Sequence, residues 1–191
     1  MLLMTFYLKT GLNGAKIITS PRLFMEMLLD KNDYYKLIIL QRANLANNYI
    51  KSAFRDHPTS VTDSSILEDL TIKYDTNRQY DHDEIEFYSI YYVIKLITGE
   101  LIGTIDLYGD TQSVEFGVFI DASHSGKNYG TEAVQSIIQF LKKNSTVRKL
   151  KWECDVGNTG SITLAQKCGF VYSNQTEIYP GRFCYVFYLN L

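Results

Sequence analysis

The chain has 191 residues, of which 46% are hydrophobic and 21% are charged, and its formal net charge is -2. No run of Lys and Arg is long enough to indicate nucleic-acid binding, and no stretch approaches the roughly 18 apolar residues of a membrane span. We therefore expect a single domain over residues 1–191 that binds neither nucleic acid nor membrane.

The three cysteines, Cys154, Cys168 and Cys184, are an odd number and lack the spacing of metal ligands. This pattern favours free thiols in a reducing compartment and predicts no metal site. Met1–Met4 is too short for the apolar part of a signal peptide. We expect a cytoplasmic protein.

The N-terminal part is expected to alternate short strands and helices. Thr5–Lys9 and Lys16–Thr19 flank a turn rich in Gly and Asn. Asp30–Asp33 provides capping residues for a helix over Tyr34–Leu40, and Asn44–Phe54 is compatible with a second helix.

A break at His57–Ser64 precedes another helix, which starts near Asp63 and has acidic residues in its first turn. The polar stretch Tyr74–Glu84 is predicted to be a solvated loop. The alternative is an acidic lip that attracts a cationic amine substrate, formed by Asp75, Asp81, Asp83 and Glu84.

From residue 87 the sequence predicts a sheet. Tyr88–Leu96 and Glu100–Tyr108 are β-branched and aromatic runs on either side of Thr98–Gly99, which indicates an antiparallel hairpin. A central strand follows from Ser113. The tail, Phe170–Leu191, offers two more strands across Pro180–Gly181.

The central strand, Val114–Asp121, runs into a loop of small and polar residues, Ala122–Gly130, and the loop opens directly into a helix. The helix is indicated by apolar residues at i, i+3 and i+4 spacing. Free backbone N–H groups at such a helix start, supported by the positive end of the helix dipole, form a site for phosphate. The spacing fits neither a P-loop nor a dinucleotide-binding fingerprint.

Ser125–Ala133 resembles the [Q/R]-x-x-G-x-[G/A] pyrophosphate loop of the GNAT N-acetyltransferase superfamily, and is most similar to the branch of ribosomal-protein N-terminal acetyltransferases. Ser125 stands where Gln or Arg is usual, and Asn128 where the first Gly is usual. Asn is the most tolerable replacement for Gly at a left-handed position.

The C-terminal third carries a second resemblance to this family. Leu150–Val156 is predicted as a strand, and it is followed by an N-x-x-S pattern at Asn158 and Ser161, a short helix, and the K-x-G-F pattern at Lys167–Phe170. Near the N-terminus, Thr19–Met25 resembles the opening T-x-R-L-x-L strand.

The resemblance implies an α+β fold, in which a mixed, mostly antiparallel sheet of about six or seven strands has helices on both faces. Residues 1–15 are then an N-terminal addition. The implied activity is transfer of an acetyl group from acetyl-CoA to a primary amine, by direct attack in a ternary complex. The acceptor is a protein N-terminal α-amine or a small amine, and the protein is a monomer or a homodimer.

The resemblance also implies roles for single residues. A backbone N–H near Val118 or Phe119, at a bulge, would polarise the thioester carbonyl, while Asn158 and Ser161 would contact the pantetheine arm. The residues expected to bind the coenzyme are Val118, Phe119, Ile120, Ser125, Gly126, Lys127, Asn128, Tyr129, Gly130, Thr131, Asn158 and Ser161.

The expected catalytic residues are Glu115 as a base and Ser161. His124, beside the loop, is expected to be an exposed loop residue. Relatives often place a Tyr as general acid where this chain has Ala165, so the proton donor is unassigned and Tyr172, Ser161 or water could serve. A CoA-binding regulatory module without catalysis is the alternative function, motivated by Ala165, Ser125 and Asn128.

Overall fold

The computed structural model describes residues 7–10, 16–44, 63–79, 89–110 and 112–191. Nine described strands form one sheet in the order β1-β2-β3-β4-β5-β6-β7-β9-β8. The strands are β1 (Tyr7–Thr10), β2 (Lys16–Thr19), β3 (Leu23–Met27), β4 (Ser89–Leu96), β5 (Leu101–Gly109), β6 (Ser113–Ile120), β7 (Lys149–Asp155), β8 (Val171–Tyr179) and β9 (Arg182–Asn190).

Neighbouring strands pair antiparallel throughout this sheet except β6 and β7, which are parallel. The expected mixed, mostly antiparallel sheet is confirmed, with more strands than expected. Part of the surplus lies at the N-terminus, where β1 and β2 form a hairpin, and the predicted strand Thr19–Met25 is split in two by a bend at Ser20–Arg22.

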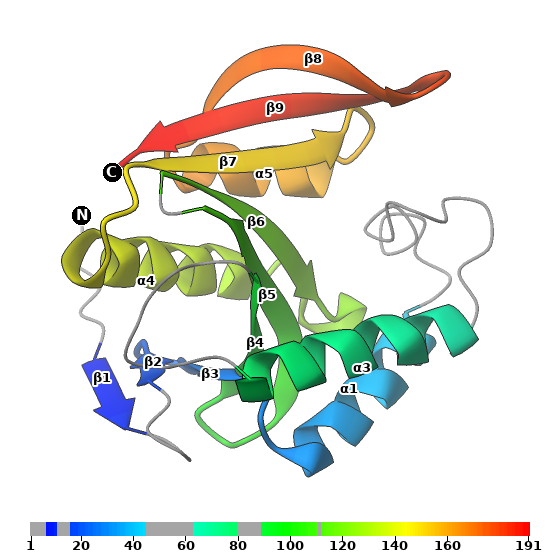
Figure 1. The fold of residues 1–191 in the computed structure, drawn as a ribbon, viewed down its shortest axis with the longest axis vertical. Helices are drawn as coiled ribbons and strands as arrows, with labels where there is room; N and C mark the ends of the chain where they lie inside the picture. The colour runs from blue at the N-terminus through cyan, green and yellow to red at the C-terminus, as the bar shows by residue number, and fades with distance from the viewer. Residues whose placement is uncertain (1–6, 11–15, 45–62, 80–88, 111) are drawn as a thin grey trace.

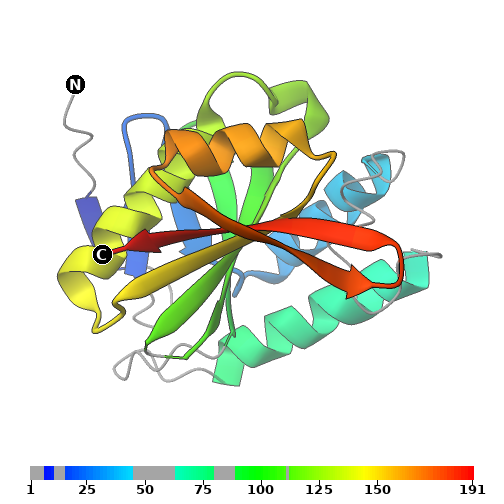
Figure 2. The ribbon, with the colours of Figure 1, turned by 90° about the horizontal axis from the view of Figure 1, so that it is seen from above.

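Helices cover both faces of the sheet, as the resemblance implied (Figures 1 and 2). They are α1 (Lys31–Ala43), α3 (Asp63–Gln79), α4 (Tyr129–Asn144) and α5 (Thr159–Lys167). Strand β4 shows how the faces are divided, because successive side chains point to opposite sides of a strand. Tyr92 and Ile94 join the core that includes α4, whereas Tyr91 and Val93 join a second core with α1 and α3.

Helix α1 extends beyond the predicted Tyr34–Leu40 at both ends, and the expected cap is present, with the Asp30 carboxylate accepting from the Asn32 backbone N–H at 2.6 Å. Helix α3 is longer than predicted and includes Tyr74–Gln79, which was expected to be loop. The reason is long-range: fully buried Asn77 donates to the Tyr91 carbonyl at 2.8 Å and accepts from the Tyr91 N–H at 3.1 Å. The predicted helix over residues 44–54 and most of the acidic lip lie outside the described residues.

Candidate functional site

Strands β6 and β7 form a fork. They pair only from Ser113 with Lys149 to Phe116 with Trp152, and the rings of this last pair are stacked with their centroids 6.2 Å apart. Beyond Phe116 the two strands diverge (Figure 1). The residues from Gly117 to Ile120 are then partly exposed, whereas Val114–Phe116 are buried.

The fork leaves backbone donors of β6 facing the gap. Asp121 donates its backbone N–H to the Ile102 carbonyl on the β5 side at 2.8 Å. Backbone N–H groups alternate in direction along a strand. The N–H of Phe119 therefore also points toward β5, whereas the N–H of Val118 points to the side on which β7 has diverged. Of the two amides expected at this place, Val118 is therefore the available one. The β5–β6 register shows no shift, so the divergence arises without the expected bulge on that side.

The start of α4 forms the second wall. Its N-cap Asn128 has a left-handed backbone (φ 64°), as expected for a Gly substitute, and its side chain makes no capping hydrogen bond. The first-turn amides of this 16-residue helix therefore lack a side-chain cap. The Asn128 Oδ1 instead accepts from Lys167 Nζ at 3.3 Å, which turns the side chain toward α5.

The loop before α4 is held by a buried carboxylate. Glu132 is 1% exposed and accepts from Ser20 Oγ at 2.7 Å and from Arg22 Nε at 2.6 Å. The Arg22 guanidinium lies 4.6 Å from the Tyr129 ring centroid, and its Nη1 donates to the Lys127 carbonyl at 3.4 Å. The bend between β2 and β3 is thereby fastened to the start of α4.

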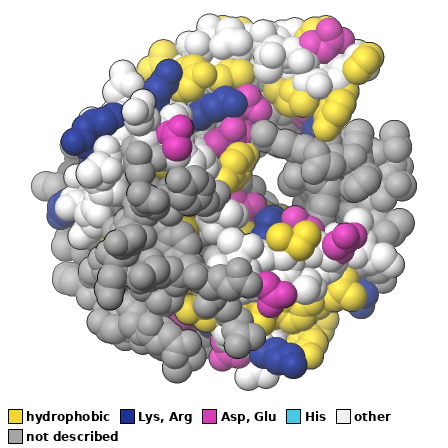
Figure 3. Space-filling model, in the orientation of Figure 1, with side chains coloured by type: hydrophobic (Ala, Val, Ile, Leu, Met, Phe, Trp, Pro, Cys, Tyr) yellow, Lys and Arg dark blue, Asp and Glu magenta, His cyan; other side chains and the backbone are white. Residues whose placement is uncertain are grey.

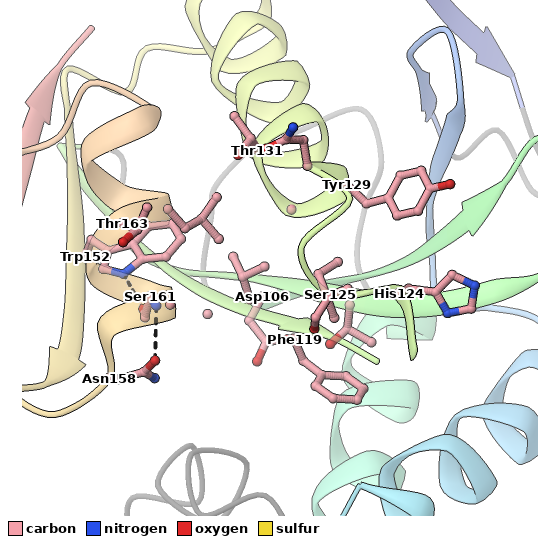
Figure 4. Close-up of a pocket in the computed structure, with 18 of the residues that line it drawn as sticks. Asp106, Phe119, His124, Ser125, Tyr129, Thr131, Trp152, Asn158, Ser161 and Thr163 are labelled. Carbon is pink, nitrogen blue, oxygen red and sulfur yellow. Dashed lines mark hydrogen bonds between the residues drawn. The ribbon is translucent and has the colours of Figure 1, made fainter. Parts of the chain in front are cut away.

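The third wall is the start of α5. Asn158 caps this helix, because its Oδ1 accepts from the Ser161 backbone N–H at 3.0 Å. Trp152 Nε1 donates to Ser161 Oγ at 2.9 Å, so the hydroxyl is oriented by β7 (Figure 4). Both Asn158 and Ser161 also line the cavity described next.

The three walls enclose a cavity of about 610 Å³. Figure 3 shows the molecule hollowed, with acidic and basic side chains at the rim of the opening. The predicted coenzyme-binding residues that line the cavity are Val118, Phe119, Ile120, Ser125, Gly126, Asn128, Tyr129, Gly130, Thr131, Asn158 and Ser161. Lys127 is exposed and does not line it.

The structure does not bring Glu115 to this cavity. The residue precedes the fork, in the part of β6 that is still paired with β7. Its buried carboxylate accepts from Tyr108 Oη at 2.5 Å and lies 3.2 Å from Lys151 Nζ. The carboxylate of the expected base is thus held by Tyr108 and Lys151 beside the cavity rather than in its lining.

A cluster that the sequence analysis missed occupies the other end of the cavity. Lys73 Nζ, from α3, lies 3.1 Å from Asp106 Oδ2 and 3.0 Å from Asp69 Oδ2, and 4.5 Å from the Tyr91 ring centroid. Gln41 of α1 donates to Tyr91 Oη at 3.2 Å. The only signal in the sequence is an acid inside the apolar run that forms β5.

Burial sets the charge states of this cluster. Burial raises the pKa of Asp106 to about 6, although the neighbouring Lys73 ammonium acts in the opposite direction. Burial also works against a charged Lys73, but Asp106, Tyr91 and Asp69 together move its pKa above the usual value. The Asp106 side chain as a whole retains 27% exposure and lines the cavity, although its Oδ1 atom is buried.

His124 also lines the cavity, although an exposed loop residue was expected. Only 14% of its side chain is exposed, and its Nδ1 lies 3.1 Å from Asp121 Oδ2. Asp121 in turn accepts from Asn44 Nδ2 at 2.7 Å, which connects this loop to the end of α1.

Two negative findings concern the described residues alone. No group of three or more His, Cys, Asp or Glu side chains among them could hold a metal ion. None of the described helices is long and apolar enough to cross a membrane.

Comparison with known proteins yields a family match and several structural neighbours. The family model for the acetyltransferase (GNAT) domain matches residues 26–171. The uncharacterized N-acetyltransferase YjdG of Bacillus subtilis is 28% identical over 90 residues, which are 46% of this chain and 54% of YjdG. The match therefore spans about half the length of that curated relative.

Two solved structures illustrate the shared fold. RimL, a ribosomal alpha-N-protein acetyltransferase in complex with coenzyme A, superposes with a TM-score of 0.73 at 16% identity, over 92% of this chain and 98% of RimL. The spermidine N-acetyltransferase from Vibrio cholerae, in complex with CoA and spermine, gives a TM-score of 0.67 at 19% identity, over 88% and 95% of the two chains.

Proposed function

Because the chain belongs to the GNAT acetyltransferase family, we propose that it transfers an acetyl group from acetyl-CoA to a primary amine. The observation that carries this proposal is the cavity that joins the uncapped start of α4 to the fork between β6 and β7. RimL and the spermidine enzyme, which share the fold, are CoA complexes.

The residues present fit the diphosphate of the coenzyme. The free backbone N–H groups at the start of α4 lie at the positive end of the helix dipole. Each contact between this end and a negatively charged phosphate contributes on the order of 0.3–1 kcal/mol. Gly126 adopts φ +76° and carries no side chain to crowd this place. Lys167, which holds Asn128, adds a positive charge beside it.

The gap between β6 and β7 offers a place for the thioester of acetyl-CoA. The Val118 amide would donate to the carbonyl oxygen as negative charge develops there, and one such donor contributes about 2.7–4 kcal/mol to a transition state. Asn158 and Ser161 stand across the gap, where the pantetheine arm would pass. The bound coenzyme supplies the activated acetyl group, and the protein supplies its orientation.

Direct attack by the amine is favoured over an acyl-enzyme. Burial raises the pKa of Cys154 to about 11 and those of Cys168 and Cys184 to about 12, so all three thiols stay protonated at neutral pH. None of them lines the cavity. A ternary complex needs no protein nucleophile.

Both acceptor classes remain candidates under this proposal, an N-terminal α-amine and a small amine. Deprotonation at pH 7 costs about 4.6 kcal/mol for a lysine-like amine but only about 1.4 kcal/mol for an α-amine. The more basic acceptor therefore demands a stronger base from the protein.

A CoA-binding regulatory module is the second candidate. Position 165, where relatives often have a Tyr, is an alanine and is fully buried in α5. It therefore offers no hydroxyl to protonate the departing thiolate. Such a module would be stabilised by CoA but would show no turnover.

The test combines calorimetry with acetyl-CoA and a thiol-release assay over peptides with free N-termini, polyamines and aminoglycosides. Ser125→Glu and Ser125→Gln are a matched pair that differ in charge but hardly in shape. The glutamate should weaken CoA binding at least tenfold, whereas the glutamine, usual in the family, should bind equally or more tightly. Equal affinities in the pair would place the diphosphate elsewhere.

Gly130→Val is the second variant. A Cβ at Gly130 would lie 3.3 Å from Leu164 Cδ2 and 3.5 Å from Ile120 Cγ1, both cavity residues, so a branched side chain would fill the space between loop and α5. CoA binding should be lost while the circular dichroism spectrum is kept. Normal binding by this variant would refute the assignment of the loop.

A further inference from the structure

We propose that Asp106 is the residue that takes the proton of the acceptor amine, and that Lys73 is the residue that positions it. This inference rests on the proposed acetyl transfer and names a group that the family resemblance did not supply. It replaces Glu115, which the structure keeps away from the cavity.

The first observation is the place of Asp106. It lies on β5 directly opposite Gly117 of β6, one residue before the Val118 amide that faces the fork. The Asp106 side chain packs over Gly117, where a Cβ would lie only 3.2 Å from Asp106 Cβ and 3.3 Å from Asp106 Oδ2. Figure 4 shows Asp106 between the side of Asn158 and Ser161 and the side of Phe119 and Ser125.

The second observation is a pair of unused acceptors. Lys73 occupies Asp106 Oδ2, but Asp106 Oδ1 is buried and has no hydrogen-bond partner. Gln41 Oε1 is the other buried side-chain atom without a partner in the described part of the chain, and both residues line this cavity. Unsatisfied buried acceptors are rare and costly, so this end of the cavity favours a ligand that brings N–H donors, such as an ammonium group.

The third observation is the charge of this end of the cavity. Within the described ranges, the charged or titratable groups that face Asp106 are Lys73 and Asp69 of α3 and Tyr91 of β4, and the β6 residue opposite, Gly117, carries no side chain. With both aspartates ionised and Lys73 charged, the cluster carries one net negative charge. It therefore attracts a cationic amine and repels a carboxylate.

The basicity of Asp106 indicates the class of amine. Burial raises its pKa to about 6, and an α-amine has a pKa of about 8, so the proton moves over a gap of about two units. For an alkylamine with a pKa of about 10.4 the gap exceeds four units. A weakly basic α-amine, such as a peptide N-terminus, therefore gives its proton to Asp106 more readily than an alkylamine does.

The ammonium gives one proton to the Asp106 carboxylate, and the free amine attacks the acetyl carbon. The C–N bond forms, the C–S bond breaks, and the electron pair leaves with the sulfur. The second proton of the amine passes to the thiolate, and the proton on Asp106 is released to water when the amide product departs.

The experiment compares the pH dependence of kcat/KM for wild type and Asp106→Asn, with a peptide bearing a free N-terminal serine as acceptor. The wild-type rate should fall tenfold per pH unit below about pH 6, because Asp106 then becomes protonated. Asp106→Asn should be at least 100-fold slower at pH 7.5, lack this acid limb, and bind CoA within twofold of wild type. Spermidine should be the poorer wild-type substrate.

Two further variants keep the test decisive. Lys73→Gln removes the ammonium that opposes the rise in the Asp106 pKa, so the acid limb should move to higher pH, an effect that loss of packing alone would not cause. Asp33→Asn changes another buried aspartate, one paired with Lys95 outside the cavity, and should affect melting but not kcat.

The outcomes separate the two proposals. If Asp106→Asn keeps more than a third of the wild-type rate, or keeps the acid limb, Asp106 is not the proton acceptor although the enzyme is an acetyltransferase. If Asp106→Asn fails to fold, an unmoved limb in Lys73→Gln overturns the inference. If wild type binds CoA but turns over no amine, the proposed function itself fails.

Discussion

Replacement of Asp121 by Asn should destabilise the protein in a pH-dependent way. Burial alone would raise the pKa of this carboxyl, but hydrogen bonds from Ser123, Asn44 and His124 outweigh it and lower the pKa to about 2. The ordinary value is 3.8. This lowering of the Asp121 pKa on folding corresponds to about 2 kcal/mol of folding free energy at neutral pH.

The sign of the pH dependence follows from the depressed pKa. The contribution of Asp121 is fully present above pH 4, where the unfolded chain would also be ionised, and it is lost as the pH falls toward 2. The difference in unfolding free energy between wild type and Asp121→Asn should therefore be about 2 kcal/mol at pH 7 and about half of that at pH 3. At pH 7 the melting temperature should fall by about 4–8 °C.

Urea unfolding at pH 7, 5 and 3, followed by circular dichroism, would measure this difference. Asp110→Asn is the matched control, because Asp110 is an exposed aspartate whose carboxylate accepts from the backbone of Gln112 and Ser113, a role that Asn can largely keep. Its melting temperature should hardly change. A difference for Asp121→Asn that stays constant from pH 7 to pH 3 would refute the reasoning.

Three further variants address the coenzyme side of the cavity. Asn128→Gly should bind CoA equally or more tightly in calorimetry, because glycine adopts φ near +64° freely; a large loss would mean that the side chain contacts the coenzyme. Glu132→Gln should lower the free energy of unfolding in urea by about 1–3 kcal/mol and raise the Kd for CoA at least tenfold, because it breaks the ion pair between Arg22 and α4. Unchanged affinity would show that the loop keeps its shape without this ion pair. Ser161→Ala should lower kcat/KM about tenfold, as for a weak orienting contact, and shift the emission of Trp152, the single tryptophan; a silent emission spectrum would contradict the hydrogen bond.

The coenzyme end was predictable from the sequence because its signals are local. A strand, a loop with Gly and Asn, and an amphipathic helix follow one another from Ser113 to Asn144, and the left-handed Asn128 was expected because it stands where the family has Gly. The hairpin of β4 and β5 was likewise visible in the alternation around Thr98–Gly99.

The acceptor end was not predictable because it consists of contacts between distant segments. Asp106, Lys73 and Gln41 come from β5, α3 and α1, and no spacing in the sequence relates them. The polar composition of Tyr74–Gln79 indicated a loop, and only the hydrogen bonds of Asn77 to β4 explain why it is helical. Glu115 had the right residue type and strand, but its partners lie on β5 and β7.

The contact between Arg22 and Glu132 joins residues 110 positions apart. During synthesis on the ribosome, Arg22 emerges long before Glu132, so the bend between β2 and β3 is fastened to the start of α4 only after more than half of the chain has been made. Under the proposed function, removal of the segment that carries Arg22 should weaken coenzyme binding from a distance, without altering any residue of the loop before α4.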